Sequence, residues 1–213
     1  MMSVEITNHS TGYLGKEIAE LFLAKGHQVT LVTVKTAVKP EPKENLKITE
    51  ITNVDSLLKV WSHLSRSTMS SSIVWLSLTI LQFIWRISLS WKIRKTPANS
   101  YISLTLKARY LSASDYQVLF LKKTPKIISL VKQWNPNIQL VGFKLLANVS
   151  KEDLFKAARA SLKRNQANII VANDLGEITP NQHIAYLVDE KGEEMVTTKS
   201  AIAQALYERI CYD

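Results

Sequence analysis

Segments with helical periodicity alternate with short β-branched runs along most of this 213-residue chain. The first helical stripe spans residues 13–25, ends at Gly26, and is followed directly by a β-branched run over residues 28–34. Alternating units of this length predict a mostly parallel sheet covered by helices, because parallel neighbours need a crossover helix between them. The other predicted strands are residues 46–51, 138–143 and 168–172, and the other predicted helices are residues 54–64, 127–134, 151–164 and 201–210.

The C-terminal half carries two further local signals. Ser150 and Asp153 resemble a capping box at a helix start, with Asp in place of the usual Glu. Residues 184–188 and 194–197 predict a small antiparallel pair. The length of the chain suits one domain, so we expect a single domain over residues 1–213.

One stretch departs from an otherwise ordinary globular composition. No Asp or Glu occurs between Asp55 and Asp115, although the chain has 18 acidic and 27 basic residues and a net charge of +9. A basic solvated surface is one interpretation of this stretch, and we expect no nucleic-acid binding, because no recognised binding motif accompanies it. The single cysteine, Cys211, excludes a disulfide framework and a cysteine-based zinc site. No signal peptide is visible, so a cytoplasmic location is expected.

A polar loop at residues 7–12 leads into the first predicted helix. Free N–H groups and the helix dipole favour anions at such a position. The amide of Asn8 can both donate and accept, which suits a carboxylate or acyl group. Plain N-capping by Ser10 or Thr11 is the alternative, and His9 fits a surface histidine.

The same region offers a competing interpretation. Gly12 and Gly15, followed by Gly26, also resemble the opening of a short-chain dehydrogenase or nucleotide-sugar epimerase. Lys35 stands near the place where an acidic residue usually binds the cofactor ribose, and no Tyr-x-x-x-Lys pair occurs in the chain. These departures weigh against NAD(P) binding, which stays an alternative.

Two later segments also carry candidate chemistry. The basic loop at residues 122–126 could hold a polyphosphate through its lysines, or could be an exposed loop. Asn173 and Asp174 end a predicted strand at its carboxyl edge, where ligands of open α/β sheets bind. A turn or a helix cap is the alternative role for this pair.

Four short segments, each weak alone, are specific when they occur together in this order. They are Ile-Thr-Asn-His-Ser-Thr-Gly at 6–12, Leu-Lys-Lys-Thr-Pro-Lys-Ile at 121–127, Val-Gly-Phe-Lys at 141–144 and Ile-Val-Ala-Asn-Asp-Leu at 170–175. Through them the chain resembles phosphopantothenate–cysteine ligases of the stand-alone streptococcal type, over residues 4–66 and 112–213. The resemblance implies a Rossmann-like α/β fold.

The resemblance also implies a reaction of coenzyme A biosynthesis. Family members activate the carboxylate of 4′-phosphopantothenate with CTP and Mg²⁺, forming an acyl-cytidylate and releasing pyrophosphate. The amine of cysteine then displaces CMP. A homodimer is implied, and the metal is expected to come with the nucleotide. An NAD(P)-binding protein and a nucleotide-binding module without turnover are the open alternatives.

Site residues follow by position from the same resemblance. Asn8 matches the asparagine that handles the acyl intermediate. The loop that holds phosphopantothenate is matched by Ser10, Thr11 and Gly12. The residues matched to nucleotide contacts are Lys123, Thr124, Pro125, Lys126, Ile127 and Phe143, and the further candidates are Lys122, Asn173 and Asp174.

Two family features are missing from this chain. Members begin with a strand and a Gly-rich turn, and in mid-chain they have a strand ending in an Ala-Val-Ser-Asp-Tyr-like motif, whose Asp contacts the nucleotide, followed by a Lys-rich loop. One set of synonymous codons for residues 70–85, read one base earlier, gives Ile-His-Ser-Met-Ala-Val-Ser-Asp-Tyr-Thr-Pro-Val-Tyr-Met. Residues 107–111 can likewise be re-read as Gly-Lys-Ile-Ser. We hypothesise that residues from about 70 to 111 are translated from a shifted frame.

The same segment has a second interpretation. Residues 67–85 carry no charge and precede a basic flank, which is typical of a membrane segment. Its many hydroxyl side chains and short apolar part argue against a membrane span. If the segment is made as written, we expect Ile73–Trp91 to be poorly packed or exposed, and prone to aggregation.

Overall fold

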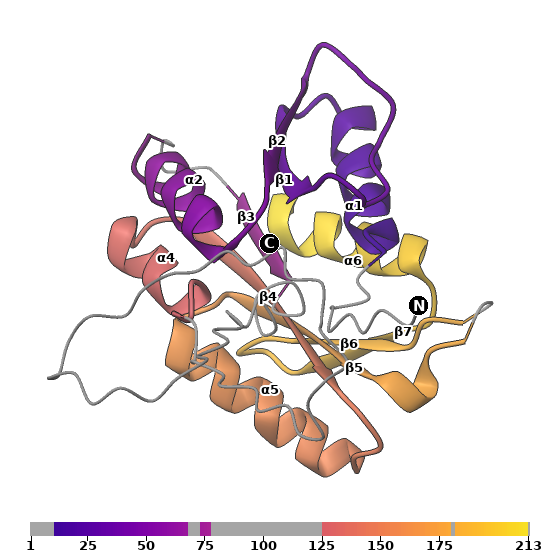
Figure 1. Cartoon of the computed structure of the whole chain (residues 1–213). Coiled ribbons are helices and arrows are strands. Elements are labelled where there is room, and N and C mark those ends of the chain that lie inside the picture. Colours follow the sequence, from indigo (N-terminus) through magenta and orange to yellow (C-terminus); the bar gives the residue numbers. More distant parts are fainter. Residues whose placement is uncertain (1–10, 68–72, 78–124, 180–181, 213) are drawn as a thin grey trace, which may run out of the picture.

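The computed structural model describes residues 11–67, 73–77, 125–179 and 182–212. Helices lie on both sides of the strands, and α1 lies alongside α6 (Figure 1). The helices are α1 (Tyr13–Ala24), α2 (Val54–Ser67), α4 (Ile128–Trp134), α5 (Lys151–Asn165), the short 3₁₀ helix η1 (Leu175–Glu177) and α6 (Lys199–Cys211). The strands are β1 (Val29–Val34), β2 (Leu46–Ile51), β3 (Ile73–Ser77), β4 (Gln139–Leu146), β5 (Ile169–Asp174), β6 (Ala185–Val188) and β7 (Glu193–Val196).

The described strands form two sheets. Strands β1 and β2 pair in parallel, with Val29 opposite Leu46. The larger sheet has the order β3-β4-β5-β6-β7, in which β3, β4 and β5 are parallel and β6 and β7 add antiparallel. The mostly parallel α/β fold with an antiparallel pair near the C-terminus is confirmed.

Strand β5 separates two buried clusters of apolar side chains. Ile170 and Ala172 belong to the cluster that includes residues of α2, α4 and α5. Ile169 and Val171 belong to the cluster that includes residues of α1 and α6. Every residue of β5 is buried, as expected for a parallel strand covered on both faces.

Local capping explains where the helices begin and end. Ser150 begins α5, because its hydroxyl oxygen accepts the Asp153 N–H at 3.1 Å, as the capping-box signal predicts. Thr198 begins α6 in the same way. Gly26, at φ 85°, ends α1 in the left-handed region, and the following N–H, of His27, donates to Phe22 C=O. This is a Schellman-type C-cap, which favours glycine.

The first five residues of the Ile73–Trp91 segment have a described backbone, and the expectation that the segment is poorly packed or exposed stays a prediction. These residues form β3 and pair in parallel with β4, from Ile73 opposite Gln139 to Ser77 opposite Phe143. The run Ile-Val-Trp-Leu consists of residues that favour strands, and strand propensity explains the pairing. Residues 78–91 lie outside the described residues.

Within the described ranges, no helix has both the length and the apolar character needed to cross a membrane. Most of the charge-free segment at 67–85 lies outside those ranges, so the membrane interpretation is tested only for the helices described here.

Candidate functional site

The carboxyl ends of the parallel strands are where α/β sheets of this kind bind ligands. The chain leaves β1 at Val34, β4 at Leu146 and β5 at Asp174, and four residues separate the end of β4 from the start of helix α5. Helix α1 begins beside the segment that follows β1, as the contacts below show. The candidate site is therefore the set of loops and helix N-termini that follow these strands, β1 in the two-stranded sheet and β4 and β5 in the larger one.

The N-terminus of α1 is held against the segment after β1. The Val38 N–H donates to Thr11 C=O at 3.0 Å. Gly12 is the N-cap residue at φ 83°, and a Cβ added there would lie 3.0 Å from Val38 O and 3.1 Å from Ala37 Cβ. Both the backbone angle and the close approach require glycine. No side chain of the described residues caps this helix, so the alternative of N-capping by Thr11 is not observed, and Ser10 lies outside those residues.

Residues 125–127 form the entry to α4. Pro125 is exposed, whereas Ile127 is fully buried in the core. The carbonyl of Lys126 accepts both the N–H and the hydroxyl of Ser129, at 3.1 and 2.7 Å. The side chain of Ile127 therefore serves packing, which leaves backbone groups, exposed Pro125 and half-buried Lys126 as the surfaces that this loop could present to a ligand.

Phe143 lies on β4 between two parallel neighbours. It pairs in register with Ser77, the last residue of β3, and with Val171 of β5. Its side chain is 8% exposed and packs in the cluster with α1 and α6. Phe143 is thus placed beside the carboxyl end of β3, on the sheet face that α1 covers.

Asn173 and Asp174 make hydrogen bonds within the protein. Asn173 is buried, and its side-chain amide donates to Ile184 C=O at 2.9 Å. The Asp174 carboxylate accepts three backbone N–H groups, from Asn148, Val149 and Gly176, each at 2.9 Å. It also caps η1, so the alternative of a helix cap fits Asp174.

We predict that Asp174 makes the fold sensitive to acid. The N–H bonds, first that of Gly176 and then those of Val149 and Asn148, lower the pKa of its carboxyl. A lowered pKa in the folded state contributes stability above the unfolded-state value of about 4, and this contribution is lost as pH falls further. Urea unfolding between pH 6 and 2.5 should show a shallower acid loss in Asp174→Asn than in the unaltered chain. Parallel curves would contradict this assignment.

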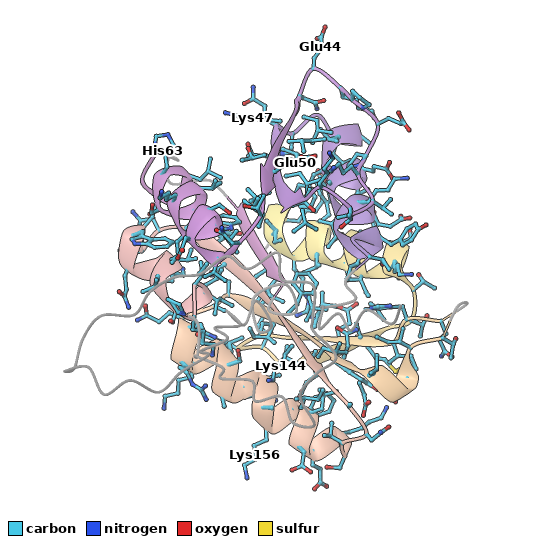
Figure 2. The ribbon with its side chains drawn as sticks, viewed as in Figure 1. Glu44, Lys47, Glu50, His63, Lys144 and Lys156 are labelled. Carbon is cyan, nitrogen blue, oxygen red and sulfur yellow. The ribbon has the colours of Figure 1, made fainter. Side chains whose placement is uncertain are left out.

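Sequence reasoning missed a second polar cluster at the same edge. Lys151, the first residue of α5, donates to the Tyr186 hydroxyl, lies 3.5 Å from Glu177 and lies 4.8 Å from the centroid of the Tyr186 ring. The bond to Tyr186 is the main cause that raises the pKa of Lys151. By contrast, Lys156 points outward from α5 (Figure 2). The one sequence signal was a lysine at a helix start, where the dipole disfavours a cation.

Several predicted site residues lie outside the described residues, so the structure does not place them. They are Asn8, His9, Ser10, Lys122, Lys123 and Thr124. Among the described residues, no group of three or more His, Cys, Asp or Glu side chains gathers in a way that could hold a metal ion.

The chain matches known proteins over nearly its whole length. The family model for the C-terminal domain of DNA/pantothenate metabolism flavoproteins matches residues 4–212. The chain belongs to this family. The resemblance to phosphopantothenate–cysteine ligases that the sequence motifs indicated is confirmed at the level of the family.

Two archaeal relatives of this family member carry the name coenzyme A biosynthesis bifunctional protein CoaBC. The protein of Thermococcus kodakarensis is 30% identical over 207 residues, and that of Methanocaldococcus jannaschii is 22% identical over 210 residues. Each match covers 96% of this chain but only 46% and 45% of the relative. The chain therefore spans about half the length of the curated relatives it matches.

Solved structures support the same family fold. The DNA/pantothenate metabolism flavoprotein from Streptococcus pneumoniae is 42% identical, with a TM-score of 0.76, and the match covers 99% of this chain and 91% of that one. A mutant of Cab2 in complex with phosphopantothenate-cysteine is 15% identical, with a TM-score of 0.69 and coverage of 96% and 79%. At that identity the second likeness shows the fold alone.

Proposed function

We propose that this chain joins 4′-phosphopantothenate to cysteine in coenzyme A biosynthesis. The observation that carries the proposal is the N-terminus of α1, which lies beside the segment after β1 within the matched family domain and has no cap bond from a described side chain. Such a terminus suits the anionic end of a substrate. The relatives named for coenzyme A biosynthesis and the phosphopantothenate-cysteine complex of Cab2 support the choice of substrates.

The proposed reaction has two steps. A carboxylate oxygen of phosphopantothenate attacks the α-phosphorus of CTP, and pyrophosphate leaves. The amine of cysteine then attacks the acyl carbon of the acyl-cytidylate, loses a proton, and displaces CMP. Cationic and N–H groups placed where charge develops stabilise both leaving groups.

The residues proposed for these steps follow the sequence resemblance. Asn8 handles the acyl intermediate, and Ser10, Thr11 and Gly12 hold phosphopantothenate. We propose nucleotide contacts for Lys123, Thr124, Pro125, Lys126, Ile127 and Phe143. Lys122 remains a candidate for the phosphates. Asn173 and Asp174 remain candidates at the same edge, where their hydrogen bonds to Ile184, Asn148, Val149 and Gly176 favour a supporting role.

The proposal also covers the nucleotide, its metal ion, the oligomeric state, the location in the cell and the number of domains. CTP is the nucleotide, and Mg²⁺ accompanies its phosphates, which suits a cation that binds through phosphates and few carboxylates. We further propose a homodimer, a cytoplasmic location and a single domain over the whole chain.

We also propose that residues from about 70 to 111 are read from a shifted frame. In the re-read sequence, the aspartate falls across Leu78 and Thr79, directly after the last residue of β3. That strand ends at Ser77, opposite Phe143, the residue proposed to pack near cytidine. An aspartate at this position would stand at the carboxyl end of a parallel strand, where α/β sheets bind ligands. The match between the re-read aspartate and the end of β3 supports the proposal.

The test is pyrophosphate release by the purified chain with CTP, Mg²⁺, 4′-phosphopantothenate and cysteine. Release that requires phosphopantothenate, together with product formation that requires cysteine, supports the ligase. A ligand-induced rise in melting temperature without CMP release would indicate a binding module instead. A rise with NADPH and none with CTP would overturn the proposal in favour of an NAD(P)-binding protein.

A further inference from the structure

Hydrogen bonds to one carboxylate hold the backbone of the loop at residues 147–150 in place. Both oxygens of Asp174 bind it, one accepting the Asn148 N–H and the other the Val149 N–H. The first oxygen also accepts the Gly176 N–H, so a single carboxylate joins the ends of β4 and β5 to η1. A charged acceptor with three N–H donors is a strong local constraint.

The backbone of this loop is also strained. Asn148 lies at φ 53°, in the left-handed region that residues other than glycine rarely adopt. A Cβ added at Gly176 would lie 3.1 Å from Asn148 Oδ1 and 3.5 Å from Asp174 Oδ1, so η1 approaches the loop closely. A strained residue persists when its surroundings over-determine it, and such residues gather at functional sites.

The residue after this loop, Lys151, also makes side-chain contacts with neighbouring elements. Lys151 anchors the start of α5 to Tyr186 of β6 and to Glu177 of η1. The loop is thus held on both sides by groups from β5, η1 and β6. These bonds fix the backbone directly after β4, the strand that carries Phe143.

We infer that Asp174 is a positioning residue for the ligation reaction, which it serves by holding the 147–150 loop so that the carboxyl end of β4 keeps the geometry needed for nucleotide binding. This inference rests on the proposed function. Asp174 acts through the loop backbone and touches neither substrate nor nucleotide. Replacing Asp174 should therefore weaken CTP binding more than a substitution far from the site that destabilises the fold by the same amount.

Asp189 offers a matched control. Its carboxylate also accepts two backbone N–H groups, from Lys191 and Gly192, and pairs with Arg209. It follows β6, which runs antiparallel to β5, so it lies at the opposite edge of the sheet. Asp189→Asn removes a comparable charge from a comparable turn, far from the candidate site.

The experiment measures the Kd of Mg²⁺–CTP for the unaltered chain, Asp174→Asn and Asp189→Asn, at a temperature where melting curves show each to be folded. We expect Kd to rise about tenfold in Asp174→Asn, as for a misplaced binding group, and to change less than about twofold in Asp189→Asn. Equal Kd values in the two variants overturn the inference. If Asp174→Asn does not fold, Gly176→Ala crowds Asn148 without removing the carboxylate, and an unchanged Kd in that variant overturns the inference.

Amide hydrogen exchange separates this inference from the proposed function. If the unaltered chain binds no CTP, the proposed function fails, and the inference is then decided by the Asn148 and Val149 amides. Faster exchange of both amides in Asp174→Asn, with no change in Asp189→Asn, supports the assignment of Asp174 as the residue that positions this loop. Unchanged exchange in Asp174→Asn overturns it.

Discussion

Restoring the shifted frame between residues 70 and 111 is expected to raise the rate of pyrophosphate release about 100-fold or more. The restored sequence gains an aspartate directly after β3, whose last residue lies opposite Phe143. By the family resemblance this carboxylate contacts the nucleotide, and removal of one preorganised polar contact commonly slows a reaction by about 10²–10³-fold. The measurement compares initial rates of the restored and unaltered chains with saturating CTP, Mg²⁺, phosphopantothenate and cysteine.

The control must separate the carboxylate from a general improvement in folding. A restored chain in which that aspartate is changed to asparagine keeps the same length, strand and surrounding sequence. We expect it to melt within a few degrees of the restored chain but to release pyrophosphate near the rate of the unaltered one. Equal rates in the restored and unaltered chains would contradict the frame-shift proposal, and codons incompatible with the re-reading would refute it directly.

The fold was predictable because its signals are local. Alternating β-branched runs and helical stripes, with a cap at Ser150 and a stop at Gly26, fix where elements begin and end. Strand β3 was missed because the segment departs from the family pattern, although strand propensity acts on the residues actually present.

The candidate site was less predictable because its contacts join distant parts of the sequence. Asp174 binds the backbone 25 and 26 residues earlier, and Lys151 reaches Tyr186 from 35 residues away. Residue type suggested a ligand for Asp174, but only the tertiary arrangement shows that its oxygens already accept three N–H groups. Backbone donors carry no residue identity, so no sequence motif could have indicated them.

Replacing Gly142 on β4 is expected to cause the largest loss of stability from a single substitution outside the site. A Cβ there would lie 2.8 Å from Ile170 Cδ1 and 2.9 Å from Ile128 Cδ1, closer than side chains tolerate. Both isoleucines are fully buried, so neither has free space into which to rotate. Gly142→Ala should cost about 1–3 kcal/mol and Gly142→Val about 3 kcal/mol or more, since overpacking exceeds the gain of roughly 1 kcal/mol in strand propensity. Urea unfolding measures both values.

Substitutions at Gly15 and Gly142 should change stability in opposite directions, and a change at Ile128 should offset part of the loss at Gly142. A Cβ at Gly15, within α1, meets nothing within 4 Å, so Gly15→Ala should stabilise the chain by about 0.5–1 kcal/mol. Ile128→Val removes the Cδ1 atom that a Cβ at residue 142 would strike, and should recover part of the loss in Gly142→Ala. Strict additivity in this double-mutant cycle would contradict the steric origin, because two residues in contact should couple by about 0.5 kcal/mol or more. Coupling of that size would show that the absence of a side chain at Gly142 lets Ile128 of α4 pack closely against β4.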